Sequence, residues 1–275
     1  MDAVTDMDAE MIQFWAEAIR NQELPPPRDS SDPYAGVDLT RQSYGQHYDV
    51  FLCGRLGLYS YNFHKGTSYK FDFVSNVYTQ SRFGLFTKFF MTLEAVNPAE
   101  NSPFTLEACV KHHDLAQSEQ IWWETCFCME TEEEDNHWDN EALPDHYKGE
   151  LPKWFSDANH QQRYVVEKSE LMDKDNEWLH LFTEFAFYTK WNLCLTPEEI
   201  TESLPLEISE VVVETEAPRE KKLKAANAIF YISFKCDDDP LTGEVANYRA
   251  VVRKTMDGKP EHMRLDARCW SIESC

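Results

Sequence analysis

The chain has 275 residues, of which 42% are hydrophobic and 13% aromatic, so it can bury a substantial core and is not intrinsically disordered. Its 49 acidic residues outnumber 26 basic ones and give a formal net charge of -23. Such a surface repels phosphate backbones, and we therefore expect no direct binding of nucleic acid.

Residues 1–40 predict a short helix followed by a linker. Residues 8–21 carry apolar side chains at helical spacing, which is typical of an amphipathic helix. Three consecutive prolines, Pro25 to Pro27, cannot continue that helix, and they predict an extended linker up to residue 40.

The same segment bears on the location of the protein. Its first eight residues are acidic and lack the apolar core of a secretory signal. No window approaches the roughly 18 uninterrupted apolar residues that span a bilayer. The eight cysteines lie mostly in apolar, strand-like runs, where a thiol behaves as a small hydrophobe. We therefore expect a reduced, cytoplasmic protein without membrane contact, with the nucleus as the alternative location.

Residues 41–130 predict one helix followed by an antiparallel sheet. From Arg41 to Asn62, aromatic and apolar side chains recur every three or four residues, which predicts a helix in spite of three glycines. Such glycines let a helix approach another surface closely, as a sheet curved around it would require. Alternating apolar residues and short connections then predict four antiparallel strands, at residues 69–79, 85–96, 104–111 and 121–129.

Residues 131–152 interrupt this pattern. From Met129 to Glu150 the chain has nine acidic residues and a single lysine. Because like charges at this density oppose compact packing, we expect an exposed, mobile insertion between two halves. Its Trp138 is a candidate contact for a partner protein. The apolar run from Leu151 to Phe155 predicts an anchor at which the chain docks again.

Residues 153–275 predict a second α+β module. The segment 175–192 has apolar side chains at helical spacing, although its alternation also permits a strand. The basic cluster 219–224 is expected to be a solvated turn. Four strands are predicted at residues 206–214, 226–234, 245–254 and 262–271. Weak similarity between the strands of the two halves suggests an internal duplication.

Two family resemblances coincide with these segments. The helix, Asn62, the pair Gly66-Thr67 and the strands that follow resemble the plant cystatin pattern. This resemblance implies an α+β fold in which a cystatin-like helix is cradled by an antiparallel sheet, and we expect two such halves.

The whole chain is similar to the male-sterility-five-type family of crucifer plants, also called the embryo-defective-type family. The resemblance implies a plant protein with relatives linked to male meiosis or embryo development, and it brings no active site. The segments that carry it are Gly57-Leu-Tyr-Ser-Tyr-Asn62 with Gly66-Thr67, Leu151-Pro-Lys-Trp154, Arg163-Tyr-Val-Val166, Glu170-Leu171 leading to Asn176-Glu-Trp-Leu179, and Asn227-Ala-Ile-Phe-Tyr231.

The cystatin resemblance implies a protease-binding wedge, of which only a degenerate form is present. Gln80 and Gly84 keep the ends of the Gln-x-Val-x-Gly hairpin, but Arg82 replaces its central valine. A charged residue there would have to be desolvated in the protease cleft, which is costly. The position expected for the Pro-Trp hairpin is occupied by His112 and His113. Inhibition of a papain-like cysteine protease is therefore the alternative function.

The cysteines do not form a recognisable chemical site. Cys126 and Cys128 are adjacent on one strand face, yet no second Cys/His pair has zinc-like spacing. Cys194 could serve as a nucleophile beside a histidine, which leaves an enzyme with a thiol site as a third hypothesis. No phosphate loop, dinucleotide fingerprint or serine elbow is present. We expect no catalytic residue, no cofactor and no metal.

Two adjacent tryptophans, Trp122 and Trp123, complete the list of candidate contacts. In a strand they point to opposite faces, so we expect one of them to be exposed. An exposed tryptophan on a sheet is a frequent protein contact. The alternative is that the N-terminal helix or the acidic insertion covers it. The leading hypothesis is a non-catalytic scaffold that binds unknown protein partners in plant reproduction or embryo development.

Overall fold

The structure, a computed structural model, describes residues 48–82, 86–113, 121–126, 138–154, 163–192, 194–259 and 262–272. The chain divides into residues 1–35 and 36–275, and every described residue belongs to the second part. The predicted helix at 8–21 and the linker therefore lie outside the described residues. Among the helices that are described, none is long and apolar enough to cross a membrane.

One helix and four strands form the first half. The predicted helix and the four predicted strands are confirmed wherever the structure describes them. Each strand pairs antiparallel with the next. The elements are α2 (Tyr48–Lys65), β1 (Lys70–Arg82), β2 (Phe86–Asn97), β3 (Ser102–His113) and β4 (Ile121–Cys126).

Asn62 connects the end of α2 to the start of β1. Its side-chain amide donates to the carbonyl of Tyr69 at 2.8 Å, and its Oδ1 accepts from the Thr67 hydroxyl at 2.8 Å. Gly66 turns the chain with a φ of 66°, which glycine adopts at little cost. This short motif sets the direction in which the chain enters the sheet.

Two glycines of α2 allow the helix to lie directly on the strands. A Cβ added to Gly54 would lie 3.0 Å from side-chain atoms of Phe71 and Val74, and one added to Gly57 would lie 3.1 Å from the Cβ of Ala108. Both distances are shorter than an ordinary van der Waals contact. The close approach predicted from these glycines is therefore confirmed.

The second half repeats this order, with a helix that precedes four antiparallel strands. Residues 175–192 are helical as predicted, and the strand alternative is wrong, because a segment that is apolar on nearly all sides suits a buried helix. The elements are α4 (Trp178–Trp191), β6 (Glu207–Glu214), β7 (Ala228–Cys236), β8 (Ala246–Thr255) and β9 (Met263–Ile272).

Three short elements of the second half are not predicted by the sequence. They are β5 (Arg163–Val165), which pairs with β6, and the helices α3 (Lys168–Leu171) and α5 (Pro197–Glu202). The basic cluster Arg219–Lys224 is a 3₁₀ helix that is largely solvated as expected, with Arg219, Lys221 and Lys224 exposed. Its Lys222 is buried, and the carboxylate of Glu170, 2.5 Å from the ammonium Nζ, offsets the cost of burying that charge.

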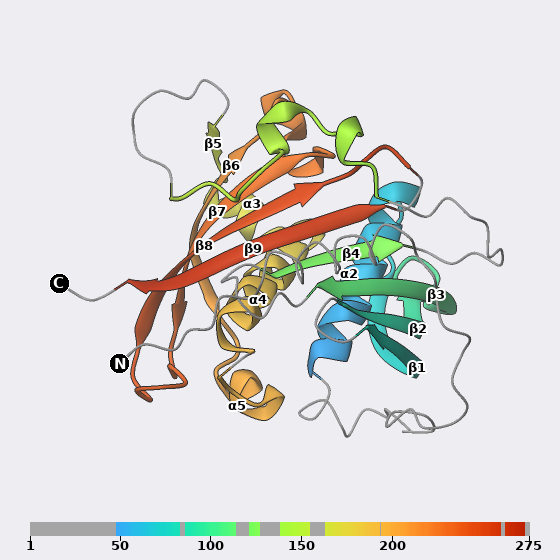
Figure 1. Cartoon of the computed structure of the whole chain (residues 1–275), viewed down its shortest axis with the longest axis horizontal. Coiled ribbons are helices and arrows are strands. Elements are labelled where there is room, and N and C mark those ends of the chain that lie inside the picture. Colours follow the sequence, from blue (N-terminus) through green and yellow to red (C-terminus); the bar gives the residue numbers. More distant parts are fainter. Residues whose placement is uncertain are drawn as a thin grey trace, which may run out of the picture. The chain divides into compact units, whose positions relative to one another are not determined.

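All nine strands belong to one antiparallel sheet, in the order β1-β2-β3-β4-β9-β8-β7-β6-β5 (Figure 1). The last strand of each half forms the junction, where Trp123 is paired with Leu265 and Thr125 with Met263. The sequence predicts a separate sheet around each helix, and this is wrong. Pairing β4 with β9 satisfies backbone groups that two separate sheets would leave exposed at their edges.

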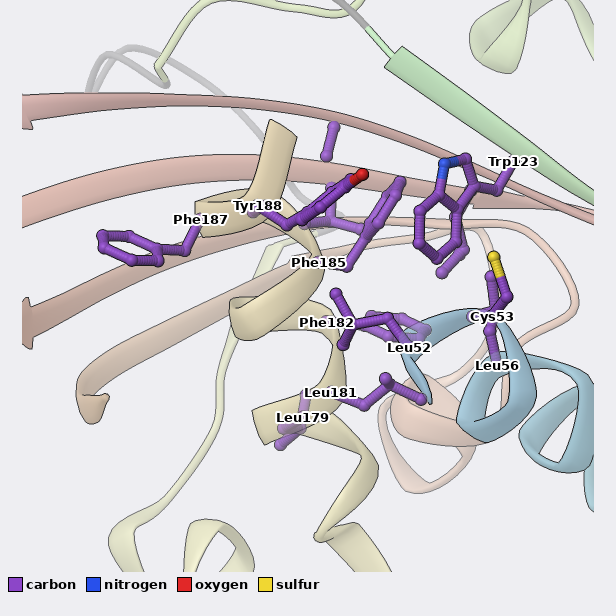
Figure 2. Close-up of a cluster of buried hydrophobic side chains, with 14 of the residues drawn as sticks. Leu52, Cys53, Leu56, Trp123, Leu179, Leu181, Phe182, Phe185, Phe187 and Tyr188 are labelled. Atoms are coloured by element: carbon purple, nitrogen blue, oxygen red, sulfur yellow. The ribbon is translucent and has the colours of Figure 1, made fainter. Parts of the chain in front are cut away.

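Both long helices pack on the same face of this sheet, here called the inner face. Helix α2 contacts β1 to β4, and α4 contacts β8, β9 and α2. Figure 2 shows Leu52 and Leu56 of α2 and Phe182 and Phe185 of α4 meeting Trp123 of β4 in one hydrophobic core. The opposite face of the sheet is called the outer face below.

Candidate interaction surface

Residues 138–154 cover part of the outer face over the second half. Tyr147 and Leu151 are 2% and 3% exposed and pack in a second hydrophobic cluster. The expectation of an exposed, mobile insertion is therefore wrong for this part of the acidic segment, whereas residues 129–137 lie outside the described residues. The acids of the segment point outward while its few apolar side chains bury outward-facing residues of β6, β7 and β8, namely Val212, Ile229, Tyr231 and Val251.

Polar contacts also attach this segment to the sheet. The backbone N–H of Asp139 donates to the Asp257 carboxylate at 3.0 Å, and the Arg253 guanidinium donates to the carbonyl of Gly149 at 3.0 Å. Arg253 also donates to Asp266 at 2.9 Å. The segment is therefore fixed at both ends, and it presents a rigid surface.

Glu214 is a third attachment point, beneath the middle of the segment. Its carboxylate lies 2.9 Å from His146 Nε2 and accepts from Arg163 at 2.6 Å and from the Tyr231 hydroxyl at 3.2 Å. Burial raises the pKa of Glu214, but the Arg163 guanidinium and the Tyr231 hydroxyl outweigh burial and lower it. The carboxylate is therefore charged and links β5, β6 and β7 to the segment.

Trp138 lies at the start of the segment and is partly exposed. The Arg264 guanidinium carbon lies 4.3 Å from the centroid of its indole ring, and the His262 ring stacks on it at 6.2 Å. Its Nε1 donates to Asn140 at 3.1 Å. Trp138 is therefore held in one position at the surface, where a partner could contact its remaining area.

A buried carboxylate supports Arg264 from below. Glu124 on β4 pairs with Arg264 on β9, and it also lies 3.4 Å from His113 and 3.7 Å from Lys111 on β3. Burial raises the pKa of Glu124, but the hydrogen bond from His113 and the charge of Arg264 lower it to about 2. This network joins both halves of the sheet under Trp138.

Two further tryptophans lie partly exposed on the same face. Trp154 and Trp270 meet edge to face, with centroids 5.9 Å apart and an angle of 88°. Trp154 also packs on Tyr231 at 5.8 Å. The predicted anchor at Leu151 and Trp154 is therefore confirmed. Trp270 could have been found from the alternation of 262–271, which places it outward.

The other predicted contacts and motifs have different outcomes. Trp123 is 1% exposed and packs between Phe185 and Tyr188, so it is a core residue and cannot contact a partner. The side chain of its neighbour Trp122 lies outside the described residues, as do Gly84 and the side chain of Gln80, whose backbone pairs with Lys88. In the described ranges no three His, Cys, Asp or Glu side chains are grouped as metal ligands.

Comparison with known proteins gives consistent matches. A family model described as Protein MS5 matches residues 151–265. One UPF0725 protein of Arabidopsis thaliana is 34% identical over 259 residues, covering 86% of this chain and 82% of that protein. Another is 36% identical over 234 residues and covers 80% of this chain, which spans only 63% of that relative's length. The crystal structure of MS5 from Brassica napus is 26% identical, with a TM-score of 0.60, and covers 82% of this chain and 98% of that one.

Proposed function

The chain belongs to the MS5 family of UPF0725 proteins, and from that premise we propose that it is a non-catalytic protein-interaction scaffold. We place its action in plant reproduction or embryo development, and its resemblance to the MS5 family supports that setting. Its place of action is the cytoplasm, with the nucleus as the alternative. The biochemical role is to hold one or more partner proteins rather than to transform a substrate.

One observation supports this proposal above the others. Trp138, Trp154 and Trp270 lie partly exposed on one face, and two of their rings are covered on one side by an arginine. Tryptophan and arginine are the residues most enriched among those that dominate the binding energy of protein interfaces. Because the 138–154 segment is fixed by Glu214 and Asp257, these rings are held in place before a partner arrives, which reduces the entropy lost on binding.

The proposal includes two modules, residues 41–130 and 153–275, with residues 131–152 between them. Each module has a helix followed by four antiparallel strands, which is the arrangement expected of a cystatin-like unit. The second module also contains β5, which precedes α4 in the sequence and pairs with β6 at the edge of the sheet. A duplicated scaffold of this kind offers one broad outer face to partners.

Affinity capture from reproductive tissue tests the proposal. Trp138→Ala should remove one or more proteins that the wild-type chain captures, while the thermal unfolding midpoint changes little. Leu241→Ala is the matched control, because Leu241 is 70% exposed on the β7–β8 turn and lies away from the three tryptophans in sequence. If the wild-type chain and the Trp138→Ala and Leu241→Ala variants capture the same proteins equally well, the scaffold role of this face is contradicted.

Protease inhibition is the second candidate function. The β1–β2 pairing ends at Arg82 and Phe86, and Gln80 lies two residues from that end of the pairing, where a wedge would begin. An inhibition assay against papain tests this candidate. Strong inhibition that is lost in Gln80→Ala and Gly84→Ala variants would favour it over the scaffold, and the absence of inhibition would exclude it.

A further inference from the structure

Four arginines project from the outer face of two neighbouring strands. Side chains two residues apart on a strand share a face. Val251 of β8 belongs to the outer hydrophobic cluster, whereas Ala250 and Val252 belong to the inner core. Residues that alternate with the inner core, or pair with Val251, therefore point outward. They include Arg249 and Arg253 on β8 and Arg264 and Arg268 on β9.

Two of these arginines have acidic partners. Arg253 donates from Nε to Asp266 at 2.9 Å, and Arg264 pairs with Glu124. Both carboxylates are almost fully buried. These two ion pairs hold the sheet together, and their charges are satisfied within the protein.

The other two arginines, Arg249 and Arg268, are here called the arginine pair. Neither one has a carboxylate within ion-pair distance among the residues that the structure describes. Both residues are half-buried, and both Nε atoms are fully buried without a hydrogen-bond partner. Arg264 has the same buried Nε, and an atom without solvent exposure cannot touch a ligand, so contact with a ligand falls to the terminal N–H groups of each guanidinium. Among the described residues no acid supplies a counter-charge to either arginine, although the chain has 49 acidic and 26 basic residues, and an external anion could supply it.

The arginine pair can reach a common ligand. Arg249 is paired with Trp270 across the strands, and Arg268 is paired with Val251. The two arginines are therefore diagonal neighbours on one face, with backbones about 7–8 Å apart, a separation that long side chains bridge. Two guanidinium groups can then converge on one group with two negative charges.

The tryptophans prepare Arg249 for such a ligand. Its guanidinium carbon lies 4.7 Å from the centroid of the Trp154 ring, and Trp154 is in turn held edge to face by Trp270. Stacking on the ring occupies one face of the guanidinium and leaves its in-plane N–H groups free. Those N–H groups form the fork that binds phosphate or carboxylate through two parallel hydrogen bonds.

We propose that the arginine pair, with Trp154 and Trp270 beside it, binds a phosphorylated serine or threonine side chain of a partner protein. This inference rests on the scaffold function proposed above and names the chemistry of the partner. A phosphate monoester carries about -1.5 to -2 charge at pH 7 and three acceptor oxygens, which matches two guanidinium groups. A single carboxylate would leave one arginine without a counter-charge. The net charge of -23 disfavours a partner that is acidic over a long stretch, so the residues flanking the phosphate should be neutral or basic.

A binding experiment with the full chain tests the proposal. Immobilised protein is offered a degenerate peptide library with a central phosphoserine, the same library with serine, and the same library with glutamate. The phosphoserine library should be retained at least about tenfold better than the other two. Arg249→Gln and Arg268→Gln should each reduce this retention about tenfold. Lys70→Gln, which removes an equal charge from an exposed lysine of β1 at the opposite edge of the sheet, should leave it unchanged. Circular dichroism and the thermal midpoint establish that each variant is folded, and Arg249→Lys provides a milder change that keeps the charge.

Several results would overturn the proposal. Equal retention of the serine or glutamate library would exclude a phosphate-specific site. Retention that both arginine variants leave intact would place binding elsewhere on the molecule. Inorganic phosphate that binds as tightly as the phosphopeptides would identify a site for a free anion rather than for a partner. If no library binds while Trp138→Ala still removes captured proteins, the phosphate site is refuted and the scaffold function stands.

Discussion

Replacing Lys254 by methionine should stabilise the protein at neutral pH, because Lys254 carries a charge into the hydrophobic core. The residue is 0% exposed on the inner face of β8. Its ammonium Nζ lies 4.0 Å from the centroid of the Phe63 ring and 5.7 Å and 5.9 Å from the Tyr59 and Trp178 ring centroids. It donates to the Tyr59 hydroxyl at 3.3 Å, and no carboxylate among the described residues pairs with it.

Burial lowers the pKa of Lys254 from 10.5 to about 7. A shift of that size corresponds to a cost of roughly 5 kcal/mol for burying the charged side chain. Cation–π contacts with the three rings offset about 2 kcal/mol of this cost. The penalty is fully present below about pH 7, where the side chain is charged in both states. It is relieved as pH rises from about 7 to 10.5, because the folded state then releases its proton while the unfolded state keeps it. Lys254→Met should thus stabilise by on the order of 3 kcal/mol near pH 7 and by less near pH 10.5.

Urea unfolding of wild-type and Lys254→Met proteins across this pH range measures the effect. Methionine has a similar length and can fill the space without a polar group. Lys224→Met, at an exposed lysine of the 3₁₀ helix, is the control and should change stability little at any pH. A Lys254→Met protein that is less stable than wild type at pH 7, or a difference that does not change with pH, would refute the reasoning.

Three further changes have expected results. Tyr147→Ala should lower the free energy of unfolding by about 3 kcal/mol in urea titrations, because it leaves a cavity in the outer hydrophobic cluster. An unchanged free energy of unfolding would mean that the 138–154 segment is only loosely attached to the sheet. Gly57→Leu should lower the thermal midpoint in spite of better helix propensity, because its Cβ meets Ala108 at 3.1 Å; an unchanged midpoint would mean that α2 can move away from β3. Glu124, with a pKa lowered from 4.5 to about 2, contributes stability that is lost as pH falls through that window. Glu124→Gln should therefore show a smaller loss of stability on acidification than wild type, and equal losses would contradict the network.

Local patterns in the sequence predict the strands closely. The strand predicted at residues 245–254 is observed at Ala246–Thr255, and the turns before and after it were recognisable from their aspartates, proline and glycines. Alternation and turn chemistry act over a few residues, so one sequence is sufficient to recognise them. The same alternation places Arg249 and Arg253 on one face of that strand.

Long-range contacts could not be predicted in the same way. The pairing of β4 with β9 joins residues such as Trp123 and Leu265, which are far apart in the chain. That pairing places Trp123 in the core, and alternation alone does not say which of the two adjacent tryptophans faces it. Whether Arg249 has an acidic neighbour also depends on which strands meet, and no local pattern contains that information.

The acidic segment shows a different limit of sequence reasoning. Its charge density suggests an exposed loop, yet Leu143, Tyr147 and Leu151 recur every four residues and are all buried. Their apolar surface finds a complementary surface on β6, β7 and β8, and this outweighs the repulsion among acids that point into solvent. The segment thereby positions Trp138 on the outer face.

Site-specific photo-crosslinking in reproductive tissue tests the scaffold claim most directly. A photoreactive amino acid at Ser233, which is paired with Arg249 on the outer face, should form crosslinks to partner proteins. The same amino acid at Leu241, which is 70% exposed at the β7–β8 turn, should form few. Crosslinks from Ser233 that disappear in the Trp138→Ala background are the predicted result. Crosslinks that form equally from both positions, or from neither, would contradict a partner-binding outer face.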